Sequence, residues 1–169
     1  MNRKLLQKAI DNLSIQMIYL HSSETKIHNG FDPLMPNQEL VGQYGITPKS
    51  CRLKEVQDTE TGEKYRFLVY QTEAAMRYLI GSNTDELKES LENEELLDKL
   101  IAAEIKATFV SEYLIKCNEE LPEDVVSEFG RLNVPHQIWA YWREYCHSTC
   151  ARMSLPVSIL PMFSINKSS

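Results

Sequence analysis

The chain has 169 residues, a formal net charge of −6 at pH 7 and a pI near 5.3. A chain of this length normally forms one domain and can bury a real core. The acidic balance argues against nucleic-acid binding through a basic surface, because the lysines and arginines are scattered along the chain. We therefore expect one domain, residues 1–169, that does not bind nucleic acid directly.

The sequence carries no pattern of export or membrane insertion. The basic residues Arg3 and Lys4 suit the start of a secretory signal, but Gln7, Lys8 and Asp11 interrupt the apolar run that should follow. No stretch approaches the roughly 20 apolar residues of a membrane-spanning helix. These patterns predict a cytoplasmic protein with no membrane partner.

The N-terminal region is expected to begin with a helix and continue as a strand. Apolar residues recur at helical spacing in Arg3–Asn12, which predicts a short helix within residues 1–12. From Ser14 to Ile27 a strand is predicted, because Ile15, Met17 and Tyr19 alternate with polar residues.

Asn29–Pro36 is expected to be a loop, because it contains one glycine and two prolines in eight residues. It also carries Phe31, Leu34 and Met35, which a fully solvated loop does not need. Either these side chains fold back on the core, or they line a groove for a partner.

Two further strands and a hairpin are expected next. Gln38–Gln57 is extended but interrupted by two glycines and Pro48, which predicts a bent or bulged strand. Residues 58–63 predict a hairpin connection in which Gly62 is free to adopt positive φ. Tyr65–Ile80 then predicts a long strand.

The acidic segment Asn83–Asp98 is either helical or irregular, and its sequence does not decide between the two. Ile101–Lys116 shows the clearest alternation in the chain and predicts a half-buried strand of an antiparallel sheet. Its apolar face carries Ile101, Ala103, Ile105, Ala107, Phe109, Tyr113 and Ile115.

Two helices are expected in the last third. The first has Pro122 in its first turn and ends at Gly130; the second is the main helix, residues 133–155, with Pro135 in its first turn. Pro156 ends the main helix because it cannot continue helical geometry. One face of this helix gathers Tyr145, Ile138, Thr149, Trp142, Met153, Cys146, Trp139 and Cys150.

Strands that are segregated from helices predict an α+β fold, a four-stranded antiparallel sheet covered on one face by the C-terminal helices. The other face would need water or a subunit. We expect Trp139, Trp142, Tyr145 and Met153 to lie in the core or at a subunit interface.

Candidate chemistry centres on Cys146, His147 and Cys150. Two cysteines one helical turn apart could hold a metal, but His147 points about 100° away from Cys146 and no second ligand pair stands at zinc-site spacing. A nucleophilic Cys–His pair lacks an activating neighbour on the same helix face. We therefore expect no metal, no cofactor and no catalytic residue.

Three stretches resemble the SecB-like chaperones. Residues 13–20 (LSIQMIYL) are similar to the first strand of that family, and a crossover loop near Asn29–Thr47 followed by a hairpin and a long fourth strand follows its sheet. The segment 129–156 contains the words W-x-Y-W-R-E-Y and A-R-M-x-L-P, which are similar to its main helix. The resemblance covers roughly residues 13–163.

The resemblance implies a homotetramer, a dimer of dimers, that holds unfolded or nascent polypeptides in hydrophobic grooves without ATP. Two features differ from the SecB of the export pathway. The tail, residues 164–169, is not acidic, so delivery to a secretion motor by the usual tail is in doubt, and a helix is added within residues 1–12.

Some SecB-like proteins protect the antitoxin of a tripartite toxin–antitoxin–chaperone module, and we favour this function. A general export chaperone and a scaffold with a single partner are the alternatives. The expected client-binding residues are Phe31, Leu34, Met35, Leu40 and Val41.

Overall fold

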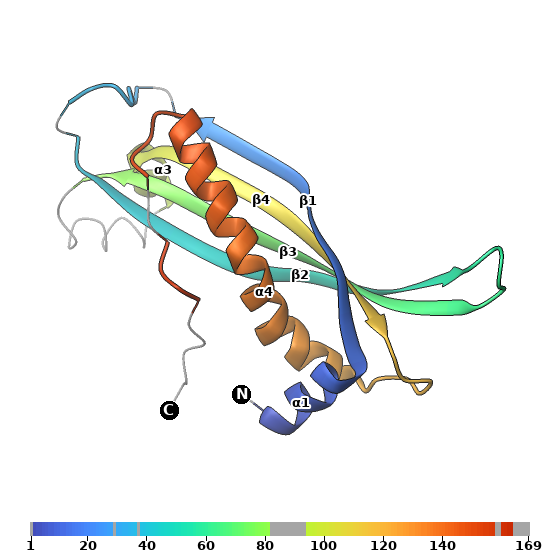
Figure 1. Cartoon of the computed structure of the whole chain (residues 1–169). Coiled ribbons are helices and arrows are strands. Elements are labelled where there is room, and N and C mark those ends of the chain that lie inside the picture. The colour runs from blue at the N-terminus through green and yellow to red at the C-terminus, as the bar shows by residue number, and fades with distance from the viewer. Residues whose placement is uncertain (1, 29, 37, 82–93, 158–159, 164–169) are drawn as a thin grey trace.

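The computed structural model describes residues 2–28, 30–36, 38–81, 94–157 and 160–163. Its helices and strands are, in order, α1 (Arg3–Asn12), β1 (Leu13–Ile27), β2 (Leu40–Gln57), β3 (Lys64–Ile80), α3 (Glu94–Leu100), β4 (Ile101–Ile115) and α4 (Glu123–Arg152) (Figure 1). The predicted tail, residues 164–169, and most of the segment that the sequence left undecided lie outside the described residues.

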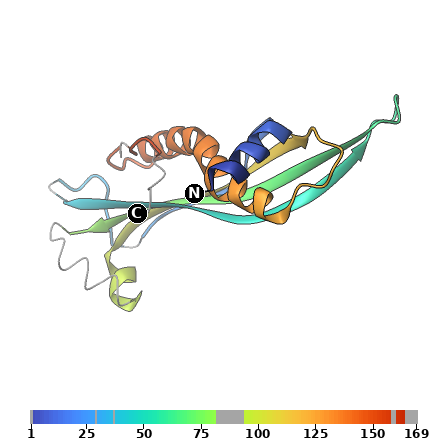
Figure 2. The same cartoon turned by 90° about the horizontal axis from the view of Figure 1, so that it is seen from below.

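The four strands form one antiparallel sheet in the spatial order β1-β4-β3-β2. This arrangement confirms the α+β fold predicted from the sequence, and it makes β1 and β2 the edge strands. Figure 2 shows α4 and α1 on one side of the sheet and α3 on the other. We call the first side the helix side and the second the open side.

The strand predictions agree closely with the structure. β2 has a register shift between Pro48 and Ser50, which confirms the predicted bulge. Gly62 in the hairpin has a φ of +75°, a conformation that favours glycine. In β4 the predicted apolar face is the one that packs under α4, with Ile105, Ala107 and Phe109 buried.

Helix α4 differs from its prediction. The sequence indicated a helix end at Gly130 and a new start at Pro135, but the structure has one helix of 30 residues. Gly130 is needed inside the helix, because a Cβ at this position would lie 2.6 Å from Cε1 of Tyr70. Pro135 is buried in the same helix and costs it one backbone hydrogen bond. Packing on the sheet therefore overrides both local helix-breaking signals.

The predicted aromatic face of α4 is confirmed as the buried one. Trp142 is fully buried and Trp139 is 6% exposed, while Tyr145 and Met153 are partly buried against the same cluster. Nearer the start of α4, Phe129 meets Tyr113 in an edge-to-face contact with ring centroids 4.9 Å apart. All of these side chains contribute to the core of this chain, and their role in a subunit interface stays a prediction.

Helix α1 supports the N-terminal half of α4. Asn2 caps α1 by accepting hydrogen bonds from two backbone N–H groups of its first turn. The backbone N–H of Asn2 donates to the Glu128 carboxylate of α4 at 2.6 Å, and Ala9 of α1 is fully buried. Among the described helices, none is long and apolar enough to cross a membrane.

Candidate peptide-binding groove

Helix α4 leaves the helix side of the edge strand β2 uncovered around Cys51 and Leu53. Cys51 and Leu53 of β2 pair with Tyr70 and Leu68 of β3, and directly opposed residues point to the same face of a sheet. Tyr70 and Leu68 are buried, whereas Cys51 is exposed and Leu53 is 52% exposed. A groove therefore runs between β2 and α4.

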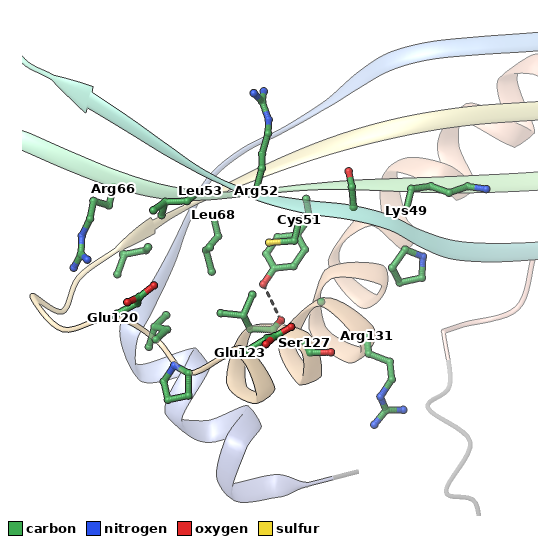
Figure 3. Close-up of a pocket in the computed structure, with 18 of the residues that line it drawn as sticks. Lys49, Cys51, Arg52, Leu53, Arg66, Leu68, Glu120, Glu123, Ser127 and Arg131 are labelled. Atoms are coloured by element: carbon green, nitrogen blue, oxygen red, sulfur yellow. Dashed lines mark hydrogen bonds between the residues drawn. The ribbon is translucent and has the colours of Figure 1, made fainter.

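One end of this groove, which we call the open end, has a volume of about 1110 Å³ (Figure 3). Its floor is formed by β2 and β3, and its wall by the first half of α4 and the loop before that helix. The apolar residues that line it include Leu53, Leu68, Leu121, Pro122 and Val126. These apolar side chains alternate with polar and charged ones along the groove, and a trough of this size can accommodate a stretch of polypeptide.

Tyr70 fixes the depth of the open end. Its hydroxyl donates to the backbone carbonyl of Val126 at 2.9 Å, and its ring lies against Gly130. Burial raises the pKa of Tyr70 far above its ordinary value, so the hydroxyl stays protonated and joins β3 to α4. The neighbouring Cys51 faces the groove, yet desolvation by its walls raises the pKa of the thiol, which makes Cys51 a poor nucleophile.

Of the basic side chains around the open end, three form an ion pair or a hydrogen bond and one points away from the groove. Lys49 forms an ion pair with Glu73 at 3.1 Å, Arg131 with Glu128 at 2.7 Å, and Arg66 donates to the backbone carbonyl of Cys117 at 2.6 Å. Figure 3 shows Arg52 pointing away from α4.

The acids are not neutralised in this way. Glu55, Glu120 and Glu123 line the groove, and none of them forms an ion pair within the described part of the chain. Arg66 and Arg52 keep their positive charges, because no carboxylate pairs with them among the described residues. The groove therefore has partly apolar walls and a rim of mixed charge with a small excess of carboxylates, which complements a peptide that carries mainly apolar side chains.

The other end of the groove, the aromatic end, follows directly along both elements. Tyr44 lies four residues before Pro48 on β2, and Trp139 lies eight residues after Arg131 on α4. The Tyr44 and Trp139 rings have their centroids 5.8 Å apart. This end is occupied by residues 160–163 of the chain itself, which we call the strap.

The structure separates the five predicted client-binding residues. Phe31 and Leu40 pack against the main core, whereas Val41 packs against a second small cluster with Leu79, Leu97 and Ile101. Leu34 and Met35 are 80% and 60% exposed. Folding back on the core, the first alternative for the loop, therefore applies to Phe31. Leu34 and Met35 are exposed, and their contact with a partner stays a prediction.

The open end was not predicted from the sequence. Its central residue, Leu53, stands among polar residues in K-S-C-R-L-K-E-V and shows no distinctive pattern. An apolar residue at the middle of a polar edge strand was the available signal. Its exposure depends on the path of α4, which no local pattern reports.

The alternative site at Cys146, His147 and Cys150 has no suitable geometry. Both cysteines are fully buried, whereas His147 is exposed, about 100° around α4 from Cys146. A hydrogen bond with Cys150 and burial raise the pKa of the Cys146 thiol far above its ordinary value. The Cys146 thiol is also 3.2 Å from the Met76 sulfur, as expected for core packing.

Comparisons with known proteins give one kind of match. No family model matches the chain, and no curated protein is significantly similar in sequence. Among solved structures, the chain is similar to the Mycobacterium tuberculosis SecB-like chaperone Rv1957, solved in complex with a ChAD peptide from the Rv1956 HigA1 antitoxin. The match covers 96% of this chain and 99% of that chain, with a TM-score of 0.69 and 15% sequence identity. The chain therefore has the fold of the SecB-like chaperones.

Proposed function

We propose that the protein is an ATP-independent holdase that binds unfolded or unassembled polypeptide, and that its favoured client is the antitoxin of a toxin–antitoxin–chaperone module. The groove between β2 and α4 is the observation that carries this proposal. The solved structure with the same fold contains an antitoxin peptide, which supports the choice of client.

The outer edge of β2 adds backbone groups to the groove. In the described sheet β2 pairs with β3 alone, so the N–H and C=O groups along its other edge are available to a client. An extended peptide can add to such an edge as a further strand and place alternate side chains in the apolar trough. This mode recognises the backbone and tolerates many sequences, as a holdase requires.

The proposal includes a cytoplasmic homotetramer. Edge strand β1 exposes several large apolar side chains, namely Ile15, Met17, Tyr19 and Leu20. An exposed apolar edge of this kind needs a cover, and a second copy of the chain supplies one by strand pairing. The mass of the purified protein in solution tests this part.

The loop residues Leu34 and Met35 are proposed to extend the client surface beyond the groove. We expect the variant Leu34→Ser/Met35→Ser to suppress aggregation of a denatured client several-fold less well, because two exposed apolar contacts are lost. Light scattering of the client with and without ATP measures this effect and also tests the independence from ATP.

The matched control is Val56→Ser, which removes an exposed apolar side chain from the open side of β2. This variant should suppress aggregation of the client as well as wild type does. Equal suppression by wild type, the loop variant and the control would remove the loop from the client surface. No suppression by wild type would contradict the holdase itself.

The alternatives are a general export chaperone and a scaffold with one partner. Co-purification from the native host separates them, because an export chaperone retains many secretory preproteins and a scaffold retains one folded protein. Recovery of one antitoxin-like protein that is unstable without this chain supports the favoured function.

A further inference from the structure

The strap, Leu160–Phe163, is seated in the aromatic end of the groove as a peptide would be. It has no regular secondary structure, and it lies against α4. Leu160 is 3% exposed and belongs to the main core cluster. The Trp139 indole N–H donates to the backbone carbonyl of Pro161 at 2.8 Å. A side chain of the groove thus binds a backbone group of the strap.

The aromatic side chain of Phe163 also holds the strap against α4. The ring of Phe163 lies 5.6 Å from that of Trp139 and 5.7 Å from that of His136, measured between centroids. Tyr44 of β2 contacts the same tryptophan. In contrast, the side chain of Met162 is 78% exposed, and its sulfur accepts a hydrogen bond from the Arg143 guanidinium at 3.3 Å. The aromatic end of the groove therefore binds the strap through one buried aliphatic side chain, one backbone carbonyl and one aromatic ring.

The chain reaches the groove through a turn that is held in a strained conformation. Ser154 follows the end of α4 with a φ of +56°, and it is the one described non-glycine residue with positive φ. Its backbone N–H and that of Leu155 donate to the carbonyls of Ala151 and Cys150, a helix-ending motif that usually contains glycine. A serine at this position costs conformational energy that a glycine does not.

We propose that the strap is an internal substitute for the client and competes with it for the aromatic end of the groove. This inference rests on the proposed function and adds its regulation by residues 160–163 of the chain itself. A client must displace the strap, so its apparent affinity falls with the fraction of molecules whose strap is seated.

The first test uses two full-length variants and a permanently unfolded client, reduced and carboxamidomethylated pancreatic trypsin inhibitor, which is basic. Phe163→Ser removes the ring that seats the strap and should tighten client binding about tenfold, as expected for the loss of a partly buried phenylalanine. Ser154→Gly removes the strain of the turn and should weaken client binding about twofold. Met162→Ser loses only an exposed contact with Arg143 and is the matched control, which should change client binding far less than Phe163→Ser.

The second test uses NMR to follow the hydrogen bond between Trp139 and the strap. The chain has two tryptophans, so it gives two indole N–H signals. Saturation with the client should shift the Trp139 signal, whose hydrogen bond to Pro161 is lost, and should leave that of the buried Trp142 in place. A peptide of sequence LPVSILPMF should bind the Phe163→Ser variant at least tenfold more tightly than LPVSILPMS.

Equal client affinity in wild type and Phe163→Ser, with an unchanged Trp139 signal, would overturn the inference and leave the holdase intact. The strap would then be a permanent part of the fold. Failure of every variant to bind the unfolded client would instead overturn the proposed function, and the inference with it.

Discussion

The two ends of the groove are built from the same strand and the same helix, yet one is filled and the other is open. At the aromatic end the large rings of Tyr44 and Trp139 meet, and the strap lies against Trp139, while Tyr44 is 49% exposed. At the open end α4 presents Gly130, and this lets the helix approach the Tyr70 ring closely. The two ends therefore differ in what lies beside the helix, because the strap packs against α4 at the aromatic end and no described segment fills the open end.

The two ends also differ in how they are held. The open end depends on α1, which bonds to the first half of α4 through Asn2 and Glu128. The aromatic end depends on the turn at Ser154, which directs the chain back along the second half of α4. Variants at each end should therefore change different properties.

The largest expected effect on stability is at Gly130. In Gly130→Ala the new methyl group would overlap Tyr70, and such overpacking costs about 1–3 kcal/mol of the free energy of unfolding. The gain in helix propensity, about 1 kcal/mol, offsets part of this cost. Urea unfolding measures the difference.

The matched control is Ser127→Ala, an exposed position one turn earlier on α4. It should change the free energy of unfolding by less than about 0.5 kcal/mol. A Gly130→Ala protein as stable as wild type, or more stable, would show that the open end does not depend on this close contact.

A smaller effect is expected at Glu128. Hydrogen bonds from the Arg131 guanidinium and from the backbone N–H of Asn2 hold the pKa of this carboxyl below its usual value. Since the folded pKa is the lower one, the carboxylate stabilises the fold above the unfolded pKa of about 4.3. That contribution is lost as the pH falls through the folded pKa. The Arg131 partner is 56% exposed and its charge is screened by solvent, so we expect Glu128→Gln to cost less than about 1 kcal/mol at pH 7.

The pH dependence gives this prediction its check. The difference in unfolding free energy between wild type and Glu128→Gln should be full at pH 7 and should shrink below about pH 4. A difference that stays constant from pH 7 to pH 3 would assign the effect to packing and not to the charge.

The sequence predicted most of the sheet because periodicity reports which strand faces are buried. The alternation in Ile101–Lys116 and the glycines and proline of Gln38–Gln57 were sufficient for this. The break in the helix was predicted wrongly because Gly130 is explained by Tyr70, a residue 60 positions away in the chain. The open end could not be predicted from the sequence for the same reason, since its boundaries are set by contacts between elements that are distant in the chain.

The central claim is that the client lies on the helix side of β2. Neighbouring residues of this strand separate the two sides, because Leu53 lines the groove and Arg52 points away from α4 (Figure 3). A photo-crosslinking amino acid placed at either position can be mixed with the unfolded client and irradiated. We predict crosslinks from position 53 and few from position 52. Crosslinks chiefly from position 52 would place the client on the open side and contradict the account.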